Sequence, residues 1–132
     1  MLAAGAAFIA TAIAVHCRTT TGEQAALRAF RSRARRIPLT VRGEVVRTLP
    51  DDQRTPRHQR FIIRTSTGQT LLVLRSIDVA QRVPLNAGDE VEVRGEYVYN
   101  PQGGLIHQVH RNLSGKGFDG WIRLLSTGRV YR

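Results

Sequence analysis

The chain has 132 residues, of which 42% are hydrophobic and 23% charged, and its formal net charge is +10. This length suits one domain with a small core, and this composition excludes a disordered chain. Such a basic balance favours polyanionic partners such as nucleic acid, phosphate groups or an anionic membrane surface. Only Lys116 among the 20 basic residues is a lysine. The alternative explanation for the positive charge is a codon usage that favours arginine over lysine, in which case the charge has no binding role.

The N-terminal segment resembles an export signal. Leu2 to Val15 is an unbroken run of apolar, glycine and threonine residues, shorter than the roughly 20 residues of a membrane span. Ala12-Ile13-Ala14 supplies the small-x-small pattern of cleavage sites. Residues 1–14 are thus predicted to be a signal peptide or N-terminal anchor, and the protein to be periplasmic, secreted or attached to a membrane surface by this segment. A buried apolar helix is the alternative. The single cysteine, Cys17, excludes an intramolecular disulfide.

The next segment, residues 15–38, is predicted to hold a linker and a basic helix. Thr20 and Glu23 have the spacing of a capping box, so a helix is expected from Glu23 to Arg36. Its apolar stripe would comprise Leu27, Phe30 and Ala34, and its other surface would carry Arg28, Arg31, Arg33, Arg35 and Arg36. Such a face suits a phosphate backbone or a membrane surface; the alternative is a solvated face.

From Leu39 onward the hydrophobic period changes from helical to two, which predicts β-strands. The alternating runs include residues 41–45, 60–64, 71–73, 91–99 and 105–111. Turn residues separate the second run from the third and the fourth from the fifth, and a short irregular or helical piece is expected at residues 77–82. Five strands with a single non-hairpin link, after the third, predict a mainly β protein with an OB-like barrel over residues 39–132.

Particular residues refine this prediction. Gly43 and Gly95 fall inside strands, where a small barrel needs bulges or sharp coiling. Tyr97 shares its parity with Val91 and Val93, which indicates a core position. Trp121 is predicted to close the core, and the alternative is a stacking platform for a ligand.

Several blocks together resemble a family of small exported bacterial proteins that is catalogued only as a domain of unknown function. The blocks are Leu49-Pro50-Asp51-Asp52, Arg57-His58-Gln59-Arg60-Phe61, Ser66 to Leu72, Ile77 to Val83, Gly95-Glu96-Tyr97, Asn100 to His107, and Gly120-Trp121. The resemblance runs from about Glu23 to the end of the chain. It implies an N-terminal signal sequence and a small β-barrel, but no function.

This chain departs from the family pattern at several polar positions. Where the family tends to have His-Asn, this chain has Arg75-Ser76. After His107 the family tends to have Trp-Thr-His-His-Asp, whereas this chain has Gln108 to Asn112, which retains one histidine. If the histidines of the family form a catalytic or metal cluster, this chain holds only part of that cluster.

The densest group of polar residues is Leu49 to Phe61, with two adjacent carboxylates, a histidine and three arginines. Carboxylates can hold a divalent metal, arginines can stabilise charge on a phosphate, and a histidine can move protons. The candidate catalytic residues of a metal-dependent phosphodiesterase are therefore Asp51, Asp52, His58 and His107, to which Asp78 could add a carboxylate. The alternative is a loop that is ordered by internal ion pairs, each worth only about 0–1 kcal/mol.

The remaining metal candidates are His107 and His110. Their odd separation places them on opposite faces of a regular strand, so one ion could bind both only if the strand ends or bulges between them. No cofactor is predicted beyond this weak divalent-metal candidate.

The leading hypothesis is a non-enzymatic module that binds an anionic ligand, above all nucleic acid. The predicted ligand contacts are Arg57, His58, Arg60, Arg64 and Arg94. An aromatic content of 6% argues against a dedicated single-strand binder. The alternatives are the phosphodiesterase, or a structural envelope protein whose charge has no ligand.

Overall fold

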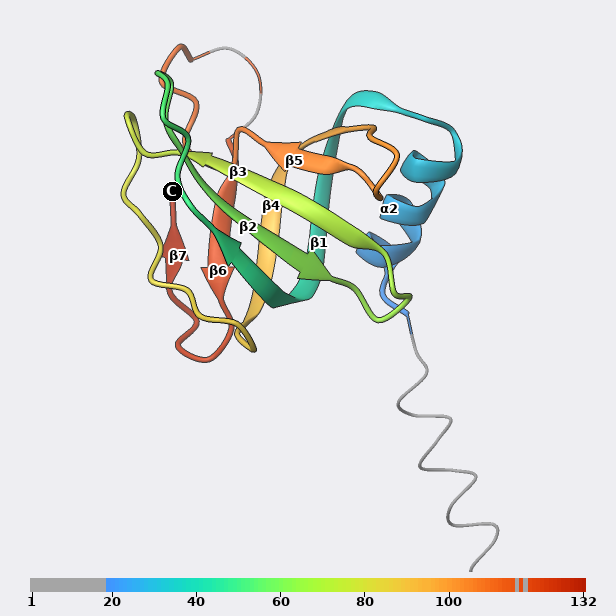
Figure 1. The fold of residues 1–132 in the computed structure, drawn as a ribbon. Coiled ribbons are helices and arrows are strands. Elements are labelled where there is room, and N and C mark those ends of the chain that lie inside the picture. The colour runs from blue at the N-terminus through green and yellow to red at the C-terminus, as the bar shows by residue number, and fades with distance from the viewer. Residues whose placement is uncertain (1–18, 116, 118) are drawn as a thin grey trace, which may run out of the picture.

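A computed structural model describes residues 19–115, 117 and 119–132. The predicted export signal at residues 1–14 and Cys17 lie outside the described residues. Helix α2 spans Thr21–Arg31, and the strands are β1 (Arg35–Leu49), β2 (His58–Arg64), β3 (Thr70–Ser76), β4 (Glu90–Val98), β5 (Leu105–His107), β6 (Trp121–Leu124) and β7 (Val130–Tyr131). Figure 1 shows α2 on one side of the strands and the loop between β1 and β2 on the other.

The strands form one sheet in the order β1-β2-β3-β5-β4-β6-β7, and β1 also pairs with β4. This extra pairing closes the first five strands into a barrel. Strands β3 and β5 are parallel, whereas the other neighbouring strands are antiparallel. The connectivity is OB-like, so the predicted mainly β barrel with a preceding helix is confirmed. Strands β6 and β7 extend the sheet beyond β4 and were not predicted.

Strand β1 turns from one neighbour to the other. Its first part pairs with β4 from Arg35 to Glu44, and its last part pairs with β2 from Glu44 to Leu49. Gly43 is buried just before this exchange, and a Cβ atom there would lie 3.0 Å from the carbonyl oxygen of Arg64. The missing side chain of Gly43 therefore lets β2 approach closely, whereas the bulge in this part of β1 lies between Val45 and Arg47.

The core follows the alternation of the strands. Its barrel residues are Leu39, Val41, Val45, Phe61, Ile63, Leu71, Val73, Val91, Val93, Tyr97 and Ile106. Tyr97 is fully buried, as predicted, and its hydroxyl donates to the carbonyl oxygen of Gly103 at 3.1 Å. The prediction for Trp121 was wrong, because Ile122 and Leu124 take the inward positions of β6. The Trp121 ring is partly exposed instead, with the guanidinium carbon of Arg123 5.4 Å from its centroid.

Helix α2 has the predicted capping box, but it begins at Thr21 rather than Glu23 and ends earlier than predicted. Its start is a capping box, in which Glu23 N–H donates to Thr20 Oγ1 at 3.2 Å and Thr20 N–H donates to Glu23 Oε2 at 2.9 Å. At its end, Ala34 N–H donates to the Ala29 carbonyl and Arg33 N–H to that of Phe30. This is a Schellman motif with Arg33 at φ +52°. The helix therefore stops at Arg31, and the predicted helical arginines beyond it lie in the cap and in β1.

Glu23 fixes α2 to the barrel. Its carboxylate also accepts from the backbone N–H and the hydroxyl of Ser66, both at 2.7 Å. Burial alone would raise the pKa of Glu23, but the hydrogen bonds from Ser66 and Thr20 outweigh it and lower the pKa below its usual value. A lowered pKa means that the charged form stabilises the fold. This stabilisation is complete above the pKa of the unfolded chain and is lost as the pH falls through the folded pKa.

We predict that Glu23→Gln lowers the free energy of unfolding by about 2 kcal/mol at pH 7, the scale of hydrogen bonds to a charged group. The difference from the wild type should narrow as the pH falls below the ordinary pKa of glutamate, and it should be lost as the pH falls through the lowered pKa of the folded protein, where the wild-type carboxylate becomes protonated. Urea unfolding at pH 7 and pH 3 measures both values. Glu44 is exposed, so Glu44→Gln is the matched control and should change the free energy of unfolding little at either pH. A difference between Glu23→Gln and the wild type that stays constant with pH would contradict a stabilising role of the Glu23 charge.

Candidate functional site

The loop between β1 and β2 is organised around Asp52. Its Oδ2 lies 2.6 Å from Nδ1 of His58, and its Oδ1 lies 3.3 Å from Nε of Arg60. The same Arg60 Nε donates to the Pro50 carbonyl at 2.8 Å. The structure thus brings together two of the predicted catalytic residues, Asp52 and His58. Because the carboxylate occupies Nδ1, Nε2 is the ring nitrogen left for a ligand or a proton.

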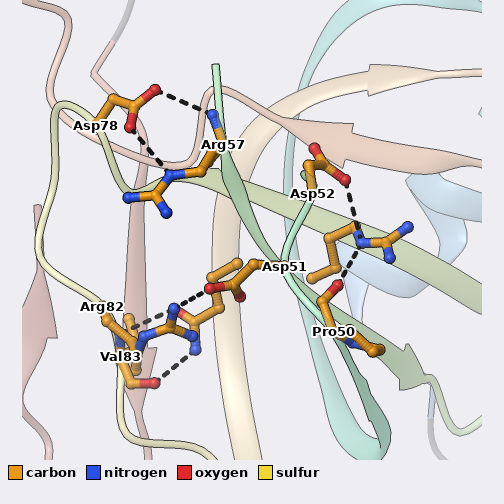
Figure 2. A network of polar contacts seen from close by, with 9 residues as sticks. Pro50, Asp51, Asp52, Arg57, Asp78, Arg82 and Val83 are labelled. Atoms are coloured by element: carbon orange, nitrogen blue, oxygen red, sulfur yellow. Dashed lines mark hydrogen bonds and ion pairs between the residues drawn. The ribbon is translucent and has the colours of Figure 1, made fainter. Parts of the chain in front are cut away.

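Two further ion pairs tie this loop to the link between β3 and β4. Asp51 Oδ2 contacts Arg82, and Asp78 Oδ2 accepts from the Arg57 N–H at 3.0 Å, with Arg57 Nε 3.9 Å from Asp78 Oδ1. Figure 2 shows both pairs beside Asp52 and Pro50. The hydrogen bond from Arg82 holds the pKa of Asp51 below its usual range against a small effect of burial. Each of the three aspartates therefore faces an arginine.

These ion pairs reduce the positive charge that the loop presents to an anion. Arg57, His58 and Arg60, three of the predicted ligand contacts, each meet a carboxylate. A phosphate that binds there must exchange with an aspartate, although exposed pairs are worth only about 0–1 kcal/mol each. A cavity of about 530 Å³ is lined by residues 50–56 and Arg60. The loop has room for a ligand, but its positive charge is largely balanced.

The other predicted residues lie apart from this loop. Arg64 is exposed at the end of β2, and Arg94 on β4 donates from Nη1 to Thr40 Oγ1 at 3.0 Å. His107 lies on β5, which β3 separates from the strand of His58. Its Nε2 is 2.8 Å from Glu96 Oε1. The predicted catalytic set is thus divided between the Asp52 loop and the β4–β5 pair.

The two metal candidates, His107 and His110, make separate contacts. Strand β5 ends at His107, as one shared ion would require, but His110 turns its Nδ1 to the Arg111 carbonyl at 2.8 Å. Within residues 19–115, 117 and 119–132, no group of three His, Cys, Asp or Glu side chains is placed to hold a metal ion.

Arg75 is a buried residue that the sequence reasoning missed. It is 0% exposed and donates only to backbone oxygens: Gln81 at 2.7 Å, Val109 at 2.6 Å, Tyr131 at 3.4 Å and Arg132 at 3.1 Å. Burial lowers the pKa of its guanidinium. The period of two through Leu71 and Val73 was the signal that placed position 75 inward. Arg75 thereby joins the β3–β4 link, the segment after β5 and the end of β7.

Gln59 was missed as well, and it supports the loop. Its buried amide donates to the Val83 carbonyl at 2.7 Å and accepts from the Val83 N–H at 2.9 Å. The link that carries Asp78 and Arg82 is therefore fixed to β2. Its first residues form turns rather than the helical piece that was one of the two predicted forms.

A group of arginines without carboxylate partners among the described residues lies elsewhere, in what we call the basic ridge. The ridge consists of Arg28, Arg31, Arg33, Arg35 and Arg36, all of which are exposed. In the described part of the chain, none of them forms an ion pair with a carboxylate. Arg28 and Arg31 lie in the last turn of α2, where a positive charge interacts favourably with the helix dipole. Arg33, Arg35 and Arg36 lie beyond the helix. Helix stability therefore does not account for the whole ridge.

The closed barrel makes this protein an OB-like domain, a class whose members bind oligonucleotides or sugars on the barrel. The chain matches the family described as "Protein of unknown function (DUF3465)" over residues 8–132, and it belongs to that family. No curated protein matches it. Among the residues that the structure describes, no helix is long and apolar enough to cross a membrane.

Proposed function

We propose that this protein is a non-enzymatic module that binds nucleic acid or another polyanion through the basic ridge. The observation that carries the proposal is the gathering of five exposed arginines, without carboxylate partners among the described residues, at the end of α2 and the start of β1. Guanidinium groups bind phosphate oxygens with two parallel hydrogen bonds. A chain with a net charge of +10 also attracts a polyanion over a distance.

The ridge is a better first contact than the Asp52 loop. Binding at the ridge displaces no described carboxylate, whereas binding at Arg57 or Arg60 replaces an existing ion pair. The secondary contacts of the proposed ligand are Arg57, His58, Arg60, Arg64 and Arg94. We expect their replacement to weaken binding less than replacement of the ridge arginines.

The aromatic rings favour backbone contact over base stacking. Tyr99 stacks on Phe30 with centroids 5.6 Å apart and has Arg33 over its ring, and Trp121 has Arg123 over its ring. Phosphate contacts carry little sequence information. The protein should therefore bind single and double strands with little sequence preference.

We predict that replacing Arg28, Arg31 and Arg33 together with alanine weakens binding to a fluorescent oligonucleotide by about tenfold or more at physiological salt. The slope of log K against log salt should fall by about 2–3, because fewer counterions are released. Fluorescence anisotropy of the full chain across a salt series measures both quantities. A triple alanine variant at Arg47, Arg54 and Arg129 removes the same charge from exposed arginines outside the ridge and should bind nearly as the wild type does. Absence of wild-type binding near physiological salt would refute the proposal.

The second candidate is a metal-dependent phosphodiesterase, which the 2.6 Å contact between Asp52 and His58 favours. Its test uses the same oligonucleotides with magnesium or calcium and then with chelator. Cleavage that needs the metal and is lost in Asp52→Asn and His58→Ala would make the loop an active site. The remaining alternative, an envelope protein without a ligand, predicts neither binding nor cleavage.

A further inference from the structure

A second cavity adjoins the basic ridge. It has a volume of about 390 Å³ and is lined by Arg35, Arg36, Glu96, Val98, His107 and Gln108. We call it the His107 cavity. It lies where the start of β1, the end of β4 and the end of β5 meet, across the strands from the Asp52 loop. The proposed function does not yet use His107 or Glu96.

A bulge brings two guanidinium groups to this cavity. Arg35 pairs with Val98 and Ile37 pairs with Tyr97, so Arg36 is an extra residue in β1. In a regular strand, two consecutive side chains point to opposite faces. Here both Arg35 and Arg36 line the same cavity. The irregularity therefore concentrates positive charge on one concave surface.

The backbone of the cavity wall is strained at two points. Arg36 has a φ of 58° and Gln108 a φ of 55°, in the left-handed region that side-chain-bearing residues rarely adopt. Such conformations persist where the surrounding structure enforces them, and they gather at ligand sites. At Gln108 this conformation also ends β5 just after His107.

The third component is a paired histidine. Glu96 and His107 are directly opposite each other on β4 and β5, and Glu96 Oε1 is 2.8 Å from His107 Nε2. The carboxylate fixes the imidazole and leaves Nδ1 as its remaining ring nitrogen. The residues that line the cavity include one carboxylate, that of Glu96, which already contacts His107. Arg35 and Arg36 therefore give the cavity an excess of positive charge.

We propose that the His107 cavity binds the terminal phosphate of a nucleic acid strand, with Arg35 and Arg36 as its charged ligands and His107 as a further contact. The proposal rests on the proposed nucleic-acid binding and deepens it. A concave site with two guanidinium groups suits a phosphate monoester, which carries more charge and more free oxygens than a phosphate within the strand. The exposed ridge beside it suits the internal phosphates.

The test compares a 5′-phosphorylated oligonucleotide with the same strand lacking that phosphate, and repeats the comparison for a 3′-phosphate. We expect the full-length wild type to prefer one phosphorylated end by about tenfold, the scale of one charge-assisted hydrogen-bonded contact. Arg36→Gly should abolish this preference. It should also raise Tm, because glycine adopts a positive φ without strain.

Arg33→Gly is the matched control. Arg33 also has a positive φ, of 52°, and it is exposed but does not line the cavity. This variant removes the same charge and relieves the same backbone conformation, so it should weaken binding to both oligonucleotides while keeping their ratio. His107→Gln, which can still donate to Glu96, should reduce the ratio without unfolding the protein.

The outcomes separate the two proposals. If the wild type binds strands with and without a terminal phosphate equally, the cavity proposal is wrong and the ridge proposal stands. If it binds neither, both are wrong. If Arg36→Gly and Arg33→Gly change the ratio alike, charge rather than the cavity is responsible. Competition by a nucleoside monophosphate at the concentration of the oligonucleotide itself would assign the cavity to a free nucleotide instead.

Discussion

Replacing Arg75 with methionine is expected to lower the free energy of unfolding by about 3 kcal/mol, more than any surface change in this chain. The guanidinium donates to four backbone oxygens from three separate segments. Buried charged groups can often be exchanged for apolar ones when both partners are replaced together. Here the acceptors belong to the backbone and cannot be replaced. Methionine would fill much of the volume but leave buried carbonyl groups without donors, each at a cost of about 1–3 kcal/mol.

Chemical denaturation of Arg75→Met beside Arg64→Met measures this effect. Arg64 is exposed at the end of β2, so its change should lie within about 0.5 kcal/mol of the wild type. The free energy of unfolding of Arg75→Lys should lie between those of Arg75→Met and Arg64→Met, because a single ammonium group cannot reach all four oxygens. If Arg75→Met were as stable as the control, the carbonyl groups must find water or other donors, and the view of Arg75 as the connector of this barrel end would be wrong.

The second large effect is expected at Gly95, an inward-facing position of β4. A Cβ atom there would lie 2.5 Å from the His107 carbonyl oxygen and 2.6 Å from side-chain atoms of Ile106 and Val109. Two of these contacts involve backbone or β5 core atoms, which cannot move without opening the barrel. Gly95→Ala should therefore lower the free energy of unfolding by about 3 kcal/mol, at the upper end of overpacking effects.

Gly43→Ala provides the internal comparison. Its added methyl group would approach Arg64 backbone oxygen at 3.0 Å and Ile63 Cβ at 3.2 Å, distances that small shifts can relieve. Urea unfolding should rank the wild type above Gly43→Ala and Gly43→Ala above Gly95→Ala. An equal loss for the two variants would mean that strand conformation, rather than the space available, decides the cost.

The sequence predicted the barrel because its strands obey a strict alternation. Each of the runs around Val41, Phe61, Leu71, Val91 and Ile106 has one buried face. Strands β6 and β7 escaped prediction because a Trp121–Leu124 strand and a Val130–Tyr131 strand are too short to show a period. The end of α2 was missed because a left-handed Arg33 replaces the glycine that usually signals a helix end.

The site was harder to predict than the fold. The clustering of acids and bases around Asp52 was visible, but not that Arg82 would engage Asp51 or that Asp78 would engage Arg57. Those pairs depend on the path of the β3–β4 link, which Gln59 fixes by contacts far apart in the sequence. The His107 cavity depends on a bulge at Arg36, and no residue type at that position indicates one.

Because the two parts of β1 pair with different strands, they can form their hydrogen bonds at different times during synthesis. The last part of β1 meets β2 soon after both leave the ribosome, since Leu49 pairs with Arg60. The first part must wait for β4, since Arg35 pairs with Val98. Until then its edge is unpaired and exposes the hydrogen-bonding groups through which strands of different molecules associate. Helix α2 directly precedes β1, so it is synthesised before β1, and it packs against this strand. In the nascent chain this helix can shield an incomplete edge before the barrel closes.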